Sequence, residues 1–316
     1  MTKSTPILII GFGSIGQRHY RNLLAMGYRN VYVYDTDKKR VQNEEFRIEN
    51  LRVKTLKNFS IVFICTPNHL HIKHALMAVR AGCHIFIEKP LSHNLKGVAE
   101  LSNVVHKNKL VNMVACNLRF HPCVRFTKDY LEKEKLGQVY SLSFEGGYFL
   151  PFWRPYRDYR KNYATKKESG GGIILDGIHE FDLLFWFNQA QVRESKFMYA
   201  KVGNLQIDVE DVCFATFVFA NKVLGVVKCD YLQKAYSRNY KIVGEKGNLE
   251  WDYRENIVWL KNEHGSKKLF EIRNYDINNF YIEEMKYFLD CVKKRRPSFN
   301  KIHDARHVLK YCVQRR

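Results

Sequence analysis

The 316-residue sequence contains no apolar run that approaches the roughly 20 residues of a membrane-spanning helix, which argues against an integral membrane protein. No Cys-x-x-Cys pair occurs among its eight cysteines, so neither a disulfide framework nor a zinc site is predicted. The first residues lack the apolar region and small-residue cleavage site of a signal peptide. Internal repeats and low-complexity linkers are also lacking. We therefore expect a globular protein of the reducing cytoplasm.

Acidic residues are scarce beside basic ones: 32 Asp and Glu accompany 52 Lys and Arg, which gives a net charge of +20. Such a charge suits either nucleic-acid binding or an enzyme that attracts anionic ligands. The basic residues are spread along the chain without a nucleic-acid-binding motif, which favours the enzyme. The longest basic cluster, Lys293 to Arg296, ends a helix-like segment, where positive charge suits the helix dipole.

The first third of the chain alternates short apolar runs with amphipathic segments, which is typical of a doubly wound parallel sheet. Strands are predicted at Ile7–Ile10, Val31–Tyr34, Ile61–Cys65, His84–Ile87 and Val111–Ala115. Helices are predicted at Ser14–Met26, His69–Arg80 and Leu95–Lys107. The stretch Thr36–Ser60 is too short and charged for two further strand–helix units, so this side of the sheet should be trimmed or irregular.

After about Asn117 the pattern changes, and from Val192 to Ile272 strands follow one another without intervening helices, which predicts a largely antiparallel sheet. These strands are predicted at Val139–Gly147, Val192–Val202, Val212–Phe219, Val223–Tyr231, Tyr240–Val243, Gly247–Trp251, Ile257–Leu260 and Lys268–Ile272. Helices are predicted at Val124–Lys133, Gly172–Phe187, Asn278–Lys293 and Ile302–Tyr311. We therefore predict two domains, an α/β domain at residues 1–118 and an α+β domain at residues 119–316.

A glycine-rich turn, Gly11-Phe12-Gly13-Ser14-Ile15-Gly16, joins the first predicted strand to the first helix. Its glycines permit a tight turn, the approach of a pyrophosphate and close packing of the helix, whose N-terminus attracts phosphate. Asp35 follows 19 residues after Gly16, where a carboxylate meets the hydroxyls of an adenine ribose. Asp35 would repel the 2′-phosphate of NADP and so favours NAD. The cations that follow it weaken this preference, so NADP stays an alternative; they are Lys38, Lys39 and Arg40.

Two further motifs stand at predicted strand ends, where open α/β sheets bind their ligands. Cys65-Thr66-Pro67-Asn68-His69-Leu70-His71 follows one strand, and an ordinary turn with Asn68 as helix N-cap is the alternative. Glu88-Lys89-Pro90 follows the next strand. Lys89 there could bind a substrate hydroxyl and stabilise negative charge on its oxygen, or it could be a surface lysine before a turn.

The fourth motif is a run of three glycines, Gly170 to Gly172, followed by Asp176, His179 and Asp182. The spacing of three places the acidic residues and the histidine on one face of the predicted helix. His179 could accept a hydroxyl proton, with Asp176 orienting its ring, or the group could be structural. No further ligands accompany this group, so we predict no metal site.

Together the motifs resemble those of the glucose–fructose oxidoreductase / inositol dehydrogenase (Gfo/Idh/MocA) family. The likeness follows the order of the glycine-rich turn, Thr-Pro-Asn with its histidine, Glu-Lys-Pro, Asn117-Leu118-Arg119-Phe120, and the three glycines with Asp and His. It implies a Rossmann domain followed by a domain with a large, open, mixed sheet. Many members have a longer interval between Asp and His than the one here, and usually continue a little further, so the last helix is expected to be shortened.

The resemblance implies hydride transfer between a nicotinamide and a hydroxyl-bearing carbon of a sugar, polyol or nucleotide sugar. Lys89 would then polarise the reacting oxygen, His179 would act as general base, and Asp176 would assist. Residues expected to bind the cofactor are Gly11, Phe12, Gly13, Ser14, Ile15, Gly16, Asp35, Cys65, Thr66, Pro67, Asn68, His71, Glu88, Lys89 and Asn117.

An aromatic and basic segment, residues 148–167, directly precedes the three glycines. Arginines suit phosphate or carboxylate, and aromatic rings suit a sugar face or a nucleobase. We therefore expect an anionic sugar, either a nucleotide sugar or a sugar acid, and a looser likeness suggests surface aminosugar biosynthesis. A basic lid or an oligomer contact is the alternative. The expected substrate residues are Arg119, Tyr148, Trp153, Arg154 and Arg160.

The sequence thus predicts a cytoplasmic NAD(P)-dependent dehydrogenase with a sugar-type substrate and no specific nucleic-acid partner. A nicotinamide-binding sensor or scaffold without turnover is the second hypothesis, and charge-driven nucleic-acid binding is the third. The exposed face of the C-terminal sheet is a plausible dimer surface, and the family likeness suggests a homodimer or homotetramer.

Overall fold

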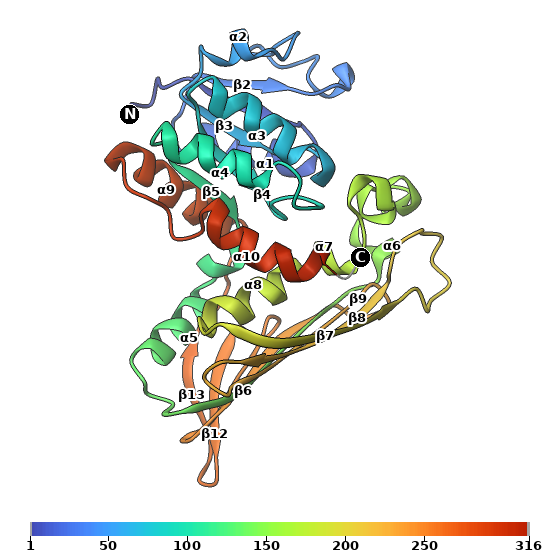
Figure 1. The fold of residues 1–316 in the computed structure, drawn as a ribbon, viewed down its shortest axis with the longest axis vertical. Coiled ribbons are helices and arrows are strands. Elements are labelled where there is room, and N and C mark those ends of the chain that lie inside the picture. The colour runs from blue at the N-terminus through green and yellow to red at the C-terminus, as the bar shows by residue number, and fades with distance from the viewer. Residues whose placement is uncertain (1, 315–316) are drawn as a thin grey trace. The chain divides into compact units, whose positions relative to one another are not determined.

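The computed structural model describes residues 2–314, which form two compact units (Figure 1). Unit 1 consists of residues up to Cys116 together with Tyr281–Val313, and unit 2 begins at Asn117 and includes the chain to Phe280. By their contacts, residues 281–313 therefore belong to unit 1. The predicted boundary at residue 118 divides cofactor binding from substrate binding, and it stays a prediction. Met1 and residues 315–316, which the predicted domains include, lie outside the described residues.

Unit 1 is built on a parallel sheet of five strands in the order β2-β1-β3-β4-β5. The strands are β1 (Ile7–Ile10), β2 (Val31–Tyr34), β3 (Ile61–Ile64), β4 (His84–Glu88) and β5 (Asn112–Ala115). Every residue of β1 and β3 is buried, as the uninterrupted apolar runs predicted. The predicted Rossmann-type sheet is confirmed.

Helices cover both faces of this sheet (Figure 1). They are α1 (Ser14–Ala25), α2 (Val53–Leu56), α3 (His71–Arg80), α4 (Val98–Lys107), α9 (Asn278–Lys294) and α10 (Ile302–Val313), with short 3-10 turns η1 (Lys38–Arg40) and η2 (Asn68–Leu70). Helices α3 and α4 lie side by side, and α10 packs against α4 and β5. Beyond β2 the chain adds a single parallel bridge, Val33 to Arg47, in place of a further strand, so the trimmed edge is confirmed.

Unit 2 is built on a mixed sheet of eight strands in the order β13-β12-β11-β10-β6-β9-β8-β7. The strands are β6 (Val139–Gly147), β7 (Val192–Ala200), β8 (Val212–Phe219), β9 (Leu224–Asp230), β10 (Ser237–Gly244), β11 (Gly247–Asp252), β12 (Ile257–Asn262) and β13 (Gly265–Glu271). Neighbours run antiparallel apart from β6 and β9, which are parallel. The large mixed sheet that the family resemblance implied is confirmed.

One face of the large sheet is covered by helices, since α8 contacts both β6 and β9. The helices of this unit are α5 (Pro122–Glu132), α6 (Leu150–Trp153), α7 (Ile173–Asp176) and α8 (Ile178–Phe187), with 3-10 turns η3 (Asn117–Phe120), η4 (Tyr159–Lys161), η5 (Tyr163–Thr165) and η6 (Lys167–Ser169). The predicted continuous helix over Gly172–Phe187 was wrong, because the helix is interrupted at Gly177. A Cβ at Gly177 would lie 2.9 Å from Sγ of Cys229, so close packing on β9 requires a glycine there.

None of the helices within residues 2–314 is long and apolar enough to cross a membrane. The same part of the chain contains no group of three or more His, Cys, Asp or Glu side chains arranged to hold a metal ion.

Candidate active site

The glycine-rich turn between β1 and α1 has the geometry of a pyrophosphate site. Gly11 has a φ of +94°, and a Cβ there would lie 2.6 Å from the carbonyl oxygen of Cys65. A Cβ at Gly16 would lie 2.0 Å from the carbonyl oxygen of Gly11, whereas a Cβ at Gly13 would meet no atom within 4 Å. Gly13 is also the N-cap of α1, and no side chain caps that helix. The open space at Gly13 and the absence of a side-chain cap at the N-terminus of α1 fit a dinucleotide pyrophosphate.

Asp35, just beyond β2, is fixed against this turn. Its Oδ2 accepts a hydrogen bond from the backbone N–H of Phe12 at 2.7 Å, and its Oδ1 accepts one from Asp37 at 2.9 Å. Each carboxylate oxygen has a second lone pair, so the group can still accept from ribose hydroxyls. Nη1 of Arg40 lies 3.4 Å from Oδ2 of Asp35.

The loop after β3 places Thr66 and His71 together. The His71 ring is 1% exposed, and its Nε2 lies 2.7 Å from the carbonyl oxygen of Thr66. Its Nδ1 lies 2.8 Å from the carbonyl oxygen of Pro90. Burial lowers the pKa of His71, and the bonds to the two carbonyls act in the opposite direction. His71 therefore connects two loops, while Asn68 lies buried in η2 and does not serve as the N-cap of α3.

The Glu88-Lys89-Pro90 turn follows β4, beside the loop after β3. Oε1 of Glu88 lies 2.6 Å from Nε2 of His19, which is fully buried on α1. Oε2 of Glu88 accepts a hydrogen bond from the backbone N–H of Lys89 at 3.2 Å. The backbone of Lys89 is therefore linked to α1, the helix that begins at the glycine-rich turn.

In unit 2, Asp176 ends α7 and His179 lies in the first turn of α8, so they do not share one helix as predicted. The Asp176 carboxylate accepts hydrogen bonds from the hydroxyls of Tyr148 and Tyr231, the latter at 3.3 Å. Burial, followed by the charge of Asp176, raises the pKa of both tyrosines well above the usual value. Both hydroxyls therefore act as donors that fix the Asp176 carboxylate beside the glycine interruption.

Arg119 and Asp182 form a buried ion pair between η3 and α8. Nε of Arg119 donates to Oδ2 of Asp182 at 2.7 Å, and Nη2 donates to Oδ1 at 2.6 Å. Their side chains are 5% and 3% exposed, and the guanidinium also lies 5.2 Å from the ring centre of Trp186. The ion pair joins η3 to α8, the helix of His179, and the predicted substrate contact of Arg119 stays a prediction. The same geometry places Asp182 in an ion pair rather than beside a metal.

The aromatic segment is anchored through Tyr148, whose ring centre lies 4.6 Å from that of the half-exposed Trp153. Trp153 stacks in turn on Tyr236, with ring centres 6.1 Å apart. Nζ of Lys234 lies 3.1 Å from the ring centre of Phe149. Aromatic rings and a cation are thus grouped near the start of the segment.

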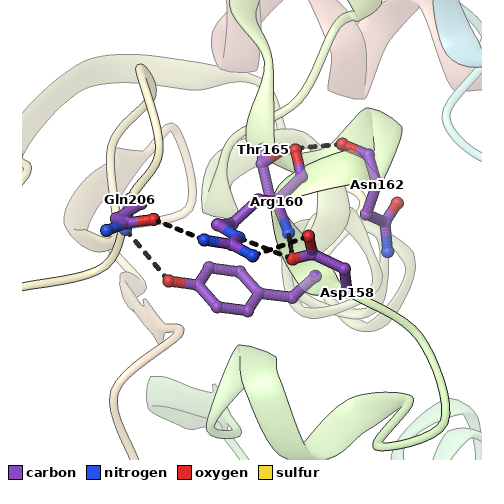
Figure 2. A network of polar contacts seen from close by, with 6 residues as sticks. Asp158, Arg160, Asn162, Thr165 and Gln206 are labelled. Carbon is purple, nitrogen blue, oxygen red and sulfur yellow. Dashed lines mark hydrogen bonds and ion pairs between the residues drawn. The ribbon is translucent and has the colours of Figure 1, made fainter.

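Arg160 organises the later part of this segment (Figure 2). Its guanidinium donates to both carboxylate oxygens of Asp158, at 2.7 and 2.9 Å, and to Gln206 at 3.2 Å. Figure 2 also shows Thr165 and Asn162, whose carbonyl oxygen accepts from the Thr165 hydroxyl at 2.7 Å. The predicted substrate residue Arg160 therefore has one partner in the same segment, Asp158, and one outside it, Gln206.

Several residues of the site were missed by the sequence analysis. His19, Tyr231, Tyr236 and Lys234 all contact predicted site residues or their segment, yet none belongs to a recognisable motif. Their contacts join residues far apart in the chain, and spacing alone gives no signal for them.

The fold and the glycine-rich site define an NAD-binding oxidoreductase with a Rossmann unit and a large-sheet unit. Residues 6–116 match the oxidoreductase family with an NAD-binding Rossmann fold, and residues 124–250 match the Gfo/Idh/MocA C-terminal domain. The chain belongs to the Gfo/Idh/MocA family of oxidoreductases. The predicted resemblance, the enzyme class and the NAD cofactor are confirmed.

Similar proteins include named sugar and polyol dehydrogenases. The chain is 26% identical to myo-inositol 2-dehydrogenase of Thermotoga maritima, over 92% of this chain and 88% of that protein. It is 28% identical to levoglucosan dehydrogenase of Pseudarthrobacter phenanthrenivorans, over 61% of this chain and 55% of that protein. A solved levoglucosan dehydrogenase with NADH shares the fold at a TM-score of 0.85 and 19% identity, covering 99% of this chain and 96% of the other.

Proposed function

We propose that this protein is an NAD-dependent dehydrogenase that transfers hydride between the nicotinamide and a hydroxyl-bearing carbon of a sugar. The observation that carries the proposal is Lys89 at the carboxyl end of β4, in the same unit as a glycine turn that fits a pyrophosphate. Relatives named for myo-inositol and levoglucosan support a sugar or polyol as the substrate class. Reduction of the matching ketone is the reverse of the same reaction.

In this proposal the side chains of the chain handle the proton and the oxygen. Lys89 hydrogen-bonds the reacting oxygen and stabilises its developing negative charge. His179 accepts the hydroxyl proton as general base. Asp176, fixed by Tyr148 and Tyr231, binds a neighbouring hydroxyl or favours the protonated His179 ring. Bound NAD supplies the hydride acceptor.

The remaining cofactor contacts are proposed from the strand ends of unit 1 and the first residue of unit 2. The turn from Gly11 to Gly16 would hold the pyrophosphate and Asp35 the adenine ribose. Asp35 favours NAD over NADP. Arg40 lies beside it and would attract the 2′-phosphate of NADP, so NADP is the alternative cofactor. The residues proposed near the nicotinamide half are Cys65, Thr66, Pro67, Asn68, His71, Glu88, Lys89 and Asn117.

We further propose that the substrate is anionic, either a nucleotide sugar or a sugar acid. The net charge of +20 attracts anions, and Trp153 and Tyr148 offer two neighbouring rings, with Arg154 next to Trp153 in the chain. Arg160 would act through the conformation of its loop, because Asp158 and Gln206 already engage its guanidinium.

The first experiment measures NADH binding by fluorescence and then turnover of neutral and anionic sugars by NADH absorbance. Myo-inositol, a hexuronic acid and a UDP-hexosamine represent the three substrate classes. Turnover that is lost in Lys89→Ala and His179→Ala but kept in Lys107→Ala, an exposed lysine at the end of α4, would support the dehydrogenase. Tight NADH binding without turnover across a wide panel would favour the alternative of a sensor or scaffold.

The anionic substrate has its own test in the arginine variants. We expect Arg154→Ala to raise KM for the anionic sugar and leave KM for NAD unchanged, whereas Arg193→Ala on β7 changes neither. Equal KM values in all three proteins would refute the anionic assignment. Salt-sensitive DNA retention with sequence preference would instead revive nucleic-acid binding.

We also propose that the exposed face of the large sheet forms a homodimer or homotetramer in the cytoplasm. Met198, Phe214, Leu224 and Val226 lie on that face, and Met198 is 72% exposed and pairs across the strands with Phe214. An apolar strip on an exposed sheet marks an interaction surface. Light scattering should show an oligomer that Phe214→Lys dissociates, and a wild-type monomer of 37.4 kDa would refute it.

A further inference from the structure

Two buried histidines contact the Glu88-Lys89-Pro90 turn from different helices of unit 1. His19 of α1 contacts the side chain of Glu88, and His71 of α3 contacts the backbone oxygen of Pro90. Lys89 lies between these two anchored residues in the chain. The turn is thus held on both sides of the lysine.

The contact from α1 is short and enclosed by aromatic rings. Nε2 of His19 lies 2.6 Å from Oε1 of Glu88, and the rings of Phe63 and Phe86 are centred 5.8 and 5.3 Å from the imidazole. The other ring nitrogen of His19 lies 3.1 Å from the sulfur of Met285 on α9. Because Oε2 of Glu88 accepts from the Lys89 N–H, this carboxylate links α1 directly to the lysine backbone.

The contact from α3 joins two loops rather than one. His71 is almost completely buried and faces the carbonyl oxygens of both Thr66 and Pro90. The Thr66 hydroxyl in turn lies 3.2 Å from Nδ1 of His74. His71 therefore sets the spacing between the loop after β3 and the loop after β4.

Packing alone does not require these polar groups. Burying an imidazole and a carboxylate costs desolvation free energy, which apolar side chains of similar volume would avoid. What a short, directional hydrogen bond adds is a fixed orientation. In this chain both fixed orientations converge on the turn that carries Lys89.

We propose that His19 and His71 are positioning residues that clamp the Glu88-Lys89-Pro90 turn and so fix the Lys89 amine for the reacting oxygen. The inference rests on the proposed role of Lys89. Loss of either contact frees the turn, and loss of the His19 contact does so while NAD binding at the glycine-rich turn persists.

The first test needs no substrate. Lysine amines of the apo enzyme are labelled with fluorodinitrobenzene. The labelling rate of Lys89 is compared by mass spectrometry with the labelling rate of the exposed Lys107. We expect His19→Leu and His71→Leu to change the Lys89 rate severalfold, with the Lys107 rate constant. His84→Gln is the matched control, because His84 begins the same strand and accepts a hydrogen bond from the Val111 N–H, far along β4 from the turn.

The second test uses the best sugar from the substrate panel with NAD. In His19→Leu, a displacement of the Lys89 amine by about 1 Å should lower kcat by about 10- to 100-fold, while KM for NAD stays close to that of wild type. The primary deuterium isotope effect on kcat should rise, because the chemical step becomes slower than product release. A loss of global stability alone would move neither the isotope effect nor the labelling ratio.

The conservative pair His19→Gln and His19→Asn keeps the inference testable if the leucine variants fail to fold. Gln can reach Glu88 and should restore wild-type labelling, whereas Asn is too short and should not. The clamp would be overturned if Lys89 were labelled at the same rate in His19→Gln and His19→Asn. It would also be overturned if Lys89 were labelled at the wild-type rate in both leucine variants. Altered labelling without turnover of any sugar by wild type would support the clamp and refute the proposed substrate class.

Discussion

Replacing Arg119 should destabilise unit 2 strongly, because it leaves the Asp182 carboxylate buried without its partner. Both side chains are at most 5% exposed and share two hydrogen bonds of 2.6 and 2.7 Å, so solvent screens the pair little. Breaking such a pair from one side costs about 3–5 kcal/mol. For Arg119→Met we therefore expect a loss of about 4 kcal/mol in the free energy of unfolding.

Urea unfolding followed by tryptophan fluorescence measures this loss selectively. All four tryptophans, Trp153, Trp186, Trp251 and Trp259, belong to unit 2. With a urea dependence of about 2 kcal/mol per molar, the midpoint should fall by about 2 M. Trp186 lies beside Arg119, so the substitution can change the fluorescence amplitude directly. The urea midpoints of the variants are therefore compared instead of the amplitudes.

Two matched variants decide whether burial is the reason. Lys133→Met breaks the exposed pair of Lys133 with Asp129, whose side chains are 58% and 55% exposed, and should cost less than about 1 kcal/mol. The double variant Arg119→Met/Asp182→Leu should recover most of the stability, because no charge then stays buried alone. Equal losses in Arg119→Met and Lys133→Met would refute the reasoning.

Three further predictions follow from the geometry. Gly16→Ala should abolish detectable NADH binding in a fluorescence titration and lower Tm, because its Cβ would lie 2.0 Å from the Gly11 oxygen; Gly13→Ala, where space is open, should weaken NADH binding at unchanged Tm. Asp35→Ser should raise the kcat/KM ratio of NADP over NAD by at least about tenfold, since a carboxylate no longer repels the 2′-phosphate, and an unchanged ratio would contradict this role. Burial, with a smaller effect of Arg238, lowers the pKa of His121 to about 4. A neutral buried histidine stabilises the fold fully above pH 6.5 and loses this stabilisation, about 3 kcal/mol, as the pH falls from 6.5 towards 4. His121→Asn should therefore flatten the dependence of the unfolding free energy on pH in that window.

The strands of unit 1 could be predicted almost to the residue because burial on both faces leaves a continuous apolar run. The fully buried Ile7–Ile10 agrees with the structure at both ends, and so does Val31–Tyr34, although its tyrosines are only partly buried. The nine-residue strand Val139–Gly147 was also predicted correctly. The helix over Gly172–Phe187 was not, because periodicity cannot show that Gly177 meets Cys229 of a strand about 50 residues later in the chain.

The candidate site divides in the same way into what residue types reveal and what folding adds. Glycines, Lys89 and His179 carry their chemistry in their identity and in their place at a strand or helix end, so the sequence could single them out. Arg119, which lies in the Asn117-Leu118-Arg119-Phe120 motif, was predicted as a substrate residue. Folding also gives it a buried partner, Asp182, that its place in the motif does not reveal.

Charge in a motif is therefore an ambiguous signal until its partner is known. Arg160 pairs with Asp158 two positions away, and a pair at such a short separation can be predicted from the sequence. Glu88 pairs with His19 across 69 positions, and the sequence alone does not predict a pair at that separation. Asp158 fixes the Arg160 guanidinium within the fold. His19 fixes the Glu88 carboxylate, which in turn holds the neighbouring Lys89 backbone. The residues to test first are those whose anchors the structure identifies, because removing the anchor separates the placement of Lys89 from its chemistry.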